Sequence, residues 1–390
     1  MARLLKILII SISMLTILTM AIPAFAQVDP EKIRDTFPTV KVFENVKDSL
    51  VSVTSVELPY SGYGLYSAYM KIITTSGGTG FMMTSDGYVL TYLGTVQESE
   101  VVKVTVGKDE YEADVVATDE FYDTALLKIN DPDAEGKTFK PIKWGDSEKM
   151  LRGDPVIVIG NPSGGVDKTI TYGFVTNFRD LRLQGPHNFD GMLVPRAIEI
   201  DAAISSGNMG APVFNKNGEV ISVVNRKGMT IPPGGRLKTE ALQDMNYTIP
   251  SNIMKNVYDQ LYEHGEVFHP WFGVFPYTQL NDRLACYMGI PVKEIDPETG
   301  KPYGIVGILI NEVASTSPAS RAGIRKGDLI LKINGNIIRT INQLEKMVLA
   351  MDEDQTFDLV LVRNGEIFYK RIRIAEKAKD YANIGYQASI

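Results

Sequence analysis

The chain has 390 residues, of which 44% are hydrophobic and 22% are charged, and its formal net charge is -7. This is the composition of a globular protein long enough for two or three domains, and an acidic chain without a basic stripe is a poor candidate for binding nucleic acid. The single cysteine, Cys286, excludes an intrachain disulfide, so the domains must be stable through their cores alone. Its helix-like surroundings predict a buried structural thiol.

The first 26 residues have the order of an export signal. Arg3 and Lys6 precede an apolar run from Ile7 to Ile22, and Ala24-Phe25-Ala26 forms a small-x-small cleavage site. The run is shorter than the ~20 residues that a membrane-spanning helix needs, which favours cleavage over an uncleaved anchor. We therefore expect residues 1–26 to be a signal peptide and the mature chain to be periplasmic or otherwise extracytoplasmic, without a stable membrane span.

Short alternating apolar runs, separated by glycine and turn residues, predict many β-strands in the first half of the chain. The clearest runs cover residues 50–54, 101–106, 156–159 and 220–224. Many short strands at regular spacing are typical of a sandwich or a barrel. The first long helical pattern covers residues 251–261, where apolar residues recur at spacings of three and four.

A domain boundary is expected between His264 and Pro270, after this helix. Beyond it the pattern predicts a second unit of strands with two helices, ending near Ile374. The tail has no clear pattern and is expected to be flexible. The resulting plan is a first domain over residues 27–262, a second over 263–376 and a tail over 377–390.

Four stretches, in matching order and spacing from about residue 45 to 262, resemble HtrA-family serine proteases. They are Gly80-Phe81 leading to residues 86–91, Asp123-Thr124-Ala125 with the strand that follows, residues 200–212, and residues 247–252. The resemblance implies a chymotrypsin-like pair of six-stranded β-barrels. The predicted fold class is therefore mainly β, a double barrel followed by an α+β unit.

The resemblance places the family's catalytic histidine at Gly94 and its nucleophilic serine at Met209, while Asp123 matches the third member of the triad. Acyl transfer needs a nucleophile whose proton is taken by a nearby base. Glycine has no side chain to accept a proton, and a thioether has no proton to lose. The sequence therefore predicts a pseudoprotease and not an enzyme, in which Asp123 remains as a turn residue and the backbone near residues 207–209 keeps an oxyanion-hole-like turn.

A protease with a non-standard site is the enzyme alternative. His264 and His269 lie at the domain junction and His187 lies in a loop, while Ser205 and Ser206 are three or four residues away from the nucleophile position. No His-Glu-x-x-His motif or clustered set of cysteines and histidines indicates a metal hydrolase, so neither a metal nor another cofactor is expected.

The second unit resembles a PDZ domain of the HtrA type. Trp271-Phe272-Gly273-Val274 matches the family's carboxylate-binding loop, and residues 307–310, 317–324, 327–328 and 333–335 match its core signature. The resemblance implies that this loop binds extended peptides with an apolar last residue, which Leu344 and Val348 of a helix over residues 341–351 would receive. Both could equally be core positions, because one face of that helix must pack inward. Residues 291–303 form a predicted added loop.

The leading functional hypothesis is an exported, non-catalytic protein that binds peptide or protein C-termini and unfolded segments in the cell envelope. It would act as a scaffold, as a chaperone-like protein or as a regulatory subunit in protein quality control. The alternatives are a serine-type endopeptidase with a non-standard site and a structural or interaction subunit of a larger envelope assembly. The resemblance permits a homotrimer, or a mixed oligomer with an active paralogue.

Overall fold

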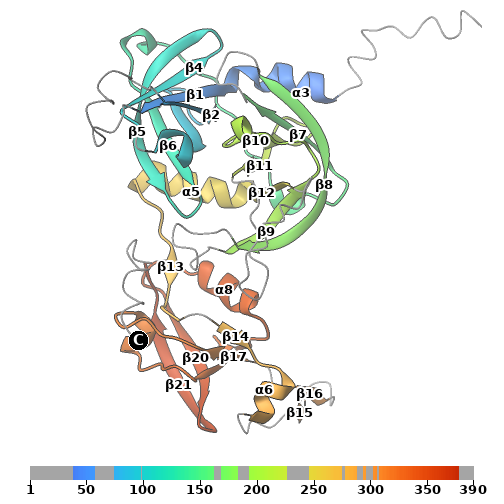
Figure 1. Ribbon diagram of the computed structural model, residues 1–390, viewed down its shortest axis with the longest axis vertical. Helices are drawn as coiled ribbons and strands as arrows, with labels where there is room; N and C mark the ends of the chain where they lie inside the picture. The colour runs from blue at the N-terminus through green and yellow to red at the C-terminus, as the bar shows by residue number, and fades with distance from the viewer. Residues whose placement is uncertain are drawn as a thin grey trace, which may run out of the picture.

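A computed structural model describes residues 38–57, 74–97, 99–161, 168–182, 193–225, 246–274, 277–287, 293–295, 302–304 and 307–376. Two closed six-stranded barrels are followed by a smaller α+β unit (Figure 1). The predicted mainly β fold class, with a double barrel first, is confirmed. The expected signal peptide, His187 and the tail over residues 377–390 lie outside the described residues.

The first barrel closes in the order β1-β2-β3-β6-β5-β4, and every pair is antiparallel. Its strands are β1 (Leu50–Glu57), β2 (Thr74–Met82), β3 (Tyr88–Tyr92), β4 (Val101–Val106), β5 (Asp109–Asp119) and β6 (Thr124–Ile129). The inward side chains, among them Val53, Val89 and Leu127, are fully buried. Alternation of apolar and polar residues along each strand therefore fills a barrel interior, as the pattern predicted.

The second barrel closes in the order β10-β11-β12-β9-β8-β7. Its strands are β7 (Pro155–Gly160), β8 (Thr169–Arg182), β9 (Leu193–Ile200), β10 (Pro212–Phe214), β11 (Val220–Val224) and β12 (Asn246–Pro250). The runs predicted over residues 50–54, 101–106, 156–159 and 220–224 are found as β1, β4, β7 and β11.

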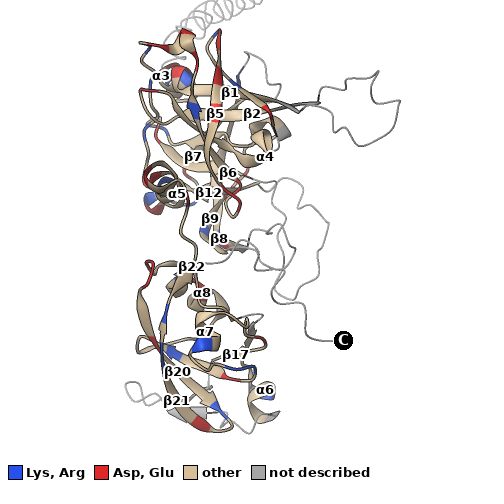
Figure 2. Cartoon of the chain, turned by 90° about the vertical axis from the view of Figure 1, so that its left-hand side faces the viewer, with Lys and Arg blue, Asp and Glu red and all other residues tan. Residues whose placement is uncertain are grey.

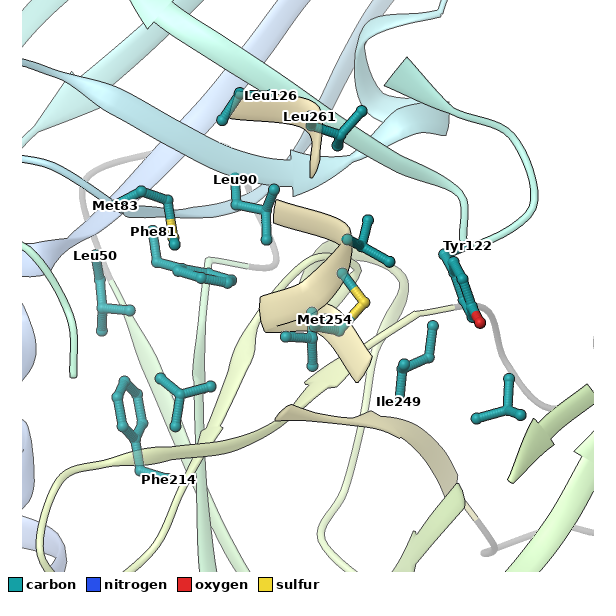
Figure 3. Packing of buried hydrophobic residues seen from close by; sticks show 14 of the residues in the cluster. Leu50, Phe81, Met83, Leu90, Tyr122, Leu126, Phe214, Ile249, Met254 and Leu261 are labelled. Atoms are coloured by element: carbon teal, nitrogen blue, oxygen red, sulfur yellow. The ribbon is translucent and has the colours of Figure 1, made fainter. Parts of the chain in front are cut away.

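The main core lies where the barrels meet α3 (Pro38–Val46) and α5 (Ser251–His264). Met254 and Leu261 of α5 are 1% exposed and point toward side chains from both barrels (Figure 3). The helix ends because Gly265 adopts a left-handed conformation, with φ 76°, and its N–H donates to the Leu261 carbonyl. The helix predicted over residues 251–261 thus fixes the two barrels to each other.

The second unit contains a five-strand path, β14-β17-β18-β20-β21, with β19 paired to β18. Its strands are β14 (Tyr277–Gln279), β17 (Ile308–Ile310), β18 (Leu329–Ile333), β19 (Asn336–Ile337), β20 (Thr356–Arg363) and β21 (Glu366–Arg373). A separate pair, β13 (Pro270–Trp271) and β22 (Ala375–Glu376), joins the two ends of the unit. Buried apolar side chains such as Ile330, Leu344 and Phe357 form a core of its own.

Three α-helices of this unit fall within its described part, where two were predicted: α6 (Asp282–Tyr287), α7 (Pro318–Arg321) and α8 (Ile341–Leu349). The prediction that Cys286 is a buried thiol is wrong, because Cys286 lies on α6 and is exposed. In the predicted loop over residues 291–303, β15 (Lys293–Ile295) pairs with β16 (Pro302–Gly304). None of the helices in the described ranges is long and apolar enough to span a membrane.

Candidate functional site

The three segments that carry Gly94, Asp123 and Met209, the positions of the family's triad, lie together between the barrels. The short helix α4 (Leu93–Val96) follows β3, and the Leu93 N–H donates to the Asp123 carbonyl at 2.8 Å. Tyr92, Asp123 and Gly210 line one cavity of about 10 Å³, which holds about one water molecule. The three segments therefore lie next to one another, and the space between their side chains is almost filled.

Tyr92 covers the backbone at Gly94. A Cβ atom added at Gly94 would lie 2.4 Å from Cε1 of Tyr92 and 3.0 Å from its hydroxyl oxygen. Real Cβ atoms essentially never approach another heavy atom so closely, so any side chain at position 94 requires the tyrosine ring to move. This contact was not predictable from the sequence, because nothing in the order Tyr92-Leu93-Gly94 indicates that the ring folds back over the glycine.

Met209 follows the 3₁₀ turn η4 (Ser206–Asn208), in which the Asn208 N–H donates to the Ser205 carbonyl at 3.0 Å. Thr79 of the first barrel holds this turn: its N–H donates to the Met209 carbonyl at 3.1 Å, and its hydroxyl to the Gly207 carbonyl at 3.0 Å. The Met209 side chain is partly buried against the core of the second barrel. A thioether therefore occupies the position where the family resemblance implies a hydroxyl.

Asp123 lies at the end of the loop between β5 and β6, in the left-handed region with φ 48°. The preceding residue, Tyr122, is buried, and its N–H donates to the Asp119 carboxylate at 2.9 Å. Burial, with the Asp119 charge adding to it, raises the pKa of Tyr122 far above its ordinary value. Buried groups therefore fix the loop that carries Asp123.

His269 is one of those groups. Its Nε2 lies 2.6 Å from Oδ1 of Asp119, with both side chains at most 5% exposed, and its ring packs 4.2 Å from that of Phe121. From the sequence, His269 was expected only to lie at the domain junction, and its contact with Asp119 was not predictable because the two residues are 150 positions apart. The pair attaches the segment between the domains to the loop of Asp123.

The predicted carboxylate-binding loop is a tight turn around Gly273. Gly273 has φ 90°, and a Cβ atom there would lie 1.9 Å from Cβ of Ser317. Phe272 is 2% exposed and packs edge-on against Phe357 at 5.5 Å. Glycine is needed here both for the backbone conformation and for the close approach of Ser317.

Two carbonyl groups of this loop are turned toward the body of the domain. The Phe272 carbonyl accepts from the Ala319 N–H at 2.8 Å, and the Gly273 carbonyl from the Ala314 N–H at 3.0 Å. In a trans peptide the carbonyl of one residue and the N–H of the next point in opposite directions. The N–H groups of Gly273 and Val274 are therefore directed away from Ala319 and Ala314, as a site for a carboxylate requires.

β14 stands first in the strand order and is therefore an edge strand. Helix α8 lies next to it. Leu344 and Val348 are 0% and 6% exposed and belong to the core of the unit. In this conformation neither side chain offers exposed surface to a ligand. Their role in receiving a peptide's last side chain stays a prediction, and it requires α8 and β14 to separate when a peptide enters.

Helix α8 also contacts the second barrel. Asp180 of β8 accepts from Lys346 Nζ at 2.7 Å and from Asn342 Nδ2 at 3.2 Å. Burial alone would raise the pKa of Asp180, but the bonds from Lys346, from the Arg196 backbone and from Asn342 outweigh it and hold that pKa below its ordinary value. The helix that flanks the predicted peptide groove is thus held to the barrel by a charged contact.

Within the described ranges no group of three or more histidine, cysteine, aspartate or glutamate side chains could hold a metal ion. Two domain families match the chain. Residues 78–223 match the trypsin-like peptidase domain, and residues 286–371 match the PDZ domain.

Curated relatives align with about three quarters of this chain. The chain is 33% identical over 293 residues to a probable periplasmic serine endoprotease DegP-like of Marinomonas sp. (strain MWYL1). This alignment covers 75% of this chain and 55% of the relative. It is 31% identical over 293 residues to the periplasmic serine endoprotease DegP of Escherichia coli (strain K12), covering 74% and 55%. The chain thus spans little more than half the length of these relatives.

Solved structures share the fold. The HtrA-type protease AlgW with a decapeptide superposes with a TM-score of 0.67 at 23% identity, covering 86% of this chain and 98% of that one. The serine endoprotease from Yersinia pestis gives a TM-score of 0.60 at 22% identity, covering 87% and 97%. The chain therefore combines a trypsin-like peptidase domain with a PDZ domain and is similar to DegP-like endoproteases over about three quarters of its length.

Proposed function

We propose that the protein is an exported, non-catalytic member of this group that binds C-termini and unfolded segments of other proteins in the cell envelope. The curated relatives are named as periplasmic endoproteases, and their location, together with the signal-like residues 1–26, supports a place outside the cytoplasm. Their catalytic activity is not part of the proposal.

The chemistry at two positions supports the loss of catalysis. Gly94 offers no base, and Met209 offers no proton that a base could remove. Without these groups, the remaining site of a serine protease accelerates hydrolysis by only about 10³–10⁴-fold over water. The ring of Tyr92, which lies over Gly94, supports the proposal further, because it occupies the space next to the missing base.

The orientation of the loop at Gly273 is the observation on which the binding function rests. Its two inward carbonyls direct the N–H groups of Gly273 and Val274 to the other side. Two adjacent amides can bind the carboxylate at the end of a peptide, and the edge strand β14 can pair with the peptide's backbone. In this combination the backbone groups of the loop and of the edge strand recognise a free C-terminus.

A second copy of the chain, or an active paralogue, is the proposed partner at the outer face of β8. Ile170, Tyr172 and Phe174 alternate along this strand and are 41%, 45% and 44% exposed, with the two aromatic rings 5.5 Å apart. Neighbouring apolar side chains that are exposed on one face are typical of an interaction surface. We expect Phe174→Glu to reduce the assembled mass measured by light scattering, and an unchanged mass would argue against this surface.

A titration of the full chain tests the binding function. The probe is a fluorescent peptide that ends in an apolar residue with a free carboxylate, and the control is the same peptide with an amidated end. We expect micromolar binding of the free form, about -8 kcal/mol, and binding of the amidated form weaker by about tenfold or more, because a charge-assisted bond is lost. Equal binding of the two forms would rule out recognition through the Gly273 loop.

A further inference from the structure

The open edge of β21 is a second place where an extended peptide can join the sheet. β21 is the last strand in the order β14-β17-β18-β20-β21, and its pairing within the described residues is with β20 alone. It runs for eight residues and exposes Ile367 and Tyr369 by 59% and 77%. A long edge strand with exposed apolar side chains is a template for pairing with another strand.

The register shows which backbone groups face the open edge. The Ile374 N–H donates to the Gln355 carbonyl at 2.8 Å, so Ile374 faces β20. In an antiparallel pair, successive residues direct their N–H and C=O groups to opposite sides. Because the register between β20 and β21 runs without a shift, Arg373, Arg371 and Tyr369 direct their N–H and C=O groups toward the open edge.

The chain already adds a strand along the continuation of this edge. β13 pairs antiparallel with β22, with Trp271 opposite Ala375. Ala375 follows Ile374 and therefore faces the same side as Arg373. A peptide paired with β21 would lie end to end with β13, on an edge whose geometry accepts an antiparallel neighbour.

A groove runs beside this edge. Its volume is about 470 Å³, and it lies between residues 371–375 and α7, with Pro318, Arg321 and Ala322 on the helical side. A helix beside an edge strand can hold the alternate side chains of an added strand while the backbone provides its hydrogen bonds. The groove is separate from the one proposed between β14 and α8, because β14 and β21 stand at opposite ends of the strand order.

Among the residues that line the groove are the cation Arg321 and the carboxylate Asp354, and a second cation, Lys370, lies nearby. Arg321 is exposed and donates to the Thr316 carbonyl at 2.9 Å, and Lys370 lies near Gly323 at the foot of α7. Neither cation forms an ion pair with a carboxylate of the described part of the chain. Figure 2 shows the blue of α7 close to blue segments of the neighbouring strands.

The other cations of the groove have partners that can be exchanged. Arg371 pairs with Asp358 at 2.7 Å, and Arg373 pairs with Asp354 at 2.5 Å. All four side chains are at least 57% exposed, and such exposed pairs contribute little to stability. An acidic ligand can therefore replace Asp358 and Asp354 as the partner of the two arginines.

We propose that this groove, the β21 edge site, binds an internal, acidic stretch of an extended polypeptide as an added antiparallel strand. The peptide backbone would bond the outward groups of Tyr369, Arg371 and Arg373, and its carboxylates would pair with Arg321 and Lys370. The site needs no free C-terminus and so works independently of the Gly273 loop. Together the two sites would hold an unfolded protein at two points, which raises its effective affinity.

The test uses the full chain and a fluorescent hexapeptide of alternating glutamate and valine, acetylated and amidated so that neither end is charged. We expect saturable binding that weakens as salt is added, because the charges lie at the surface. Arg321→Glu combined with Lys370→Glu should weaken it by about tenfold or more. The control is Lys332→Glu, which makes the same kind of charge reversal on the central strand β18. It should change the affinity of the unmodified chain by no more than about twofold.

A second variant tests the backbone bonds. Tyr369→Pro removes an N–H that faces the open edge and leaves the ladder with β20 intact, so it should also weaken binding by about tenfold or more. The proposal is overturned by any of three results. The unmodified chain does not bind the peptide, a lysine–valine peptide binds with equal affinity, or Lys332→Glu weakens binding as much as the two charge reversals. Because the probe has no C-terminal carboxylate, failure here leaves the C-terminus titration unaffected.

Discussion

Replacing Gly273 by alanine should unfold or loosen the PDZ domain, in addition to any effect on binding. The residue has φ 90°, and an added Cβ would lie 1.9 Å from Cβ of Ser317, which is fully buried. The left-handed conformation costs a non-glycine residue about 1–2 kcal/mol, and overpacking adds about 1–3 kcal/mol. The free energy of unfolding of the domain should therefore fall by about 2–5 kcal/mol, a large share of the ~5–15 kcal/mol of a typical domain.

Urea denaturation of the Gly273→Ala chain measures this loss. Trp271 fluorescence reports on the PDZ domain once the other tryptophan, in the barrel, is removed by Trp144→Phe. A slope of about 1–3 kcal/mol per M urea converts the loss into a midpoint lower by about 1 M or more.

The matched control adds Ser317→Gly, which removes the clashing side chain. Ser317 caps α7 by accepting from the Ser320 N–H at 3.1 Å, and a change from serine to glycine at such a cap costs only a few tenths, about 0.3 kcal/mol. The double variant should therefore recover about 1–3 kcal/mol relative to Gly273→Ala. If the two changes are simply additive, the clash with Ser317 is not the reason that position 273 is glycine.

Three further predictions follow from buried or charged contacts. Asp328 is 1% exposed and lies 2.6 Å from Arg363, so Arg363→Leu leaves its carboxylate as a buried charge without an ion-pair partner. Urea denaturation should then show a free energy of unfolding lower by about 3–5 kcal/mol, and a decrease below about 1 kcal/mol would contradict this. The lowered pKa of Asp180 means that its contribution to stability is complete at neutral pH and is lost progressively as pH falls below about 3.9, so Asp180→Asn should destabilise the chain at pH 7 and destabilise it less as the pH is lowered from about 4. Gly94→His with Met209→Ser should remain inactive on casein unless Tyr92→Ala is added, because the tyrosine ring occupies the space of a side chain at 94. Activity of the pair above background, and equal to that of the triple variant, would show that Tyr92 is no obstacle.

The fold was predictable because it depends on repeated local patterns. Alternating apolar runs such as residues 101–106 and 220–224 became strands whose buried faces fill a barrel. The helix pattern over residues 251–261 also gave α5, because its apolar spacing of three and four is the spacing of one buried face. In each case the residues that determine the element lie within the element itself.

The site was less predictable because its decisive contacts join distant positions. The pairing of His269 with Asp119 and the packing of Ser317 on Gly273 connect residues that no local pattern relates. Cys286 was predicted to be buried because it lies in a helix-like stretch, but its side chain is exposed on that short helix. The burial of Leu344 was left open, since a helix pattern gives the apolar face but not what covers it.

The central claim, that the protein binds and does not cut, is tested most directly by turnover. The purified mature chain is incubated with casein and with a fluorogenic peptide, beside the Asp123→Ala variant and an active HtrA-type protease. We predict that the chain and the variant give the same background rate, because Gly94 and Met209 provide neither a base nor a nucleophile. Hydrolysis above background that Asp123→Ala abolishes would contradict the account, since it would reveal a working site built around the remaining aspartate.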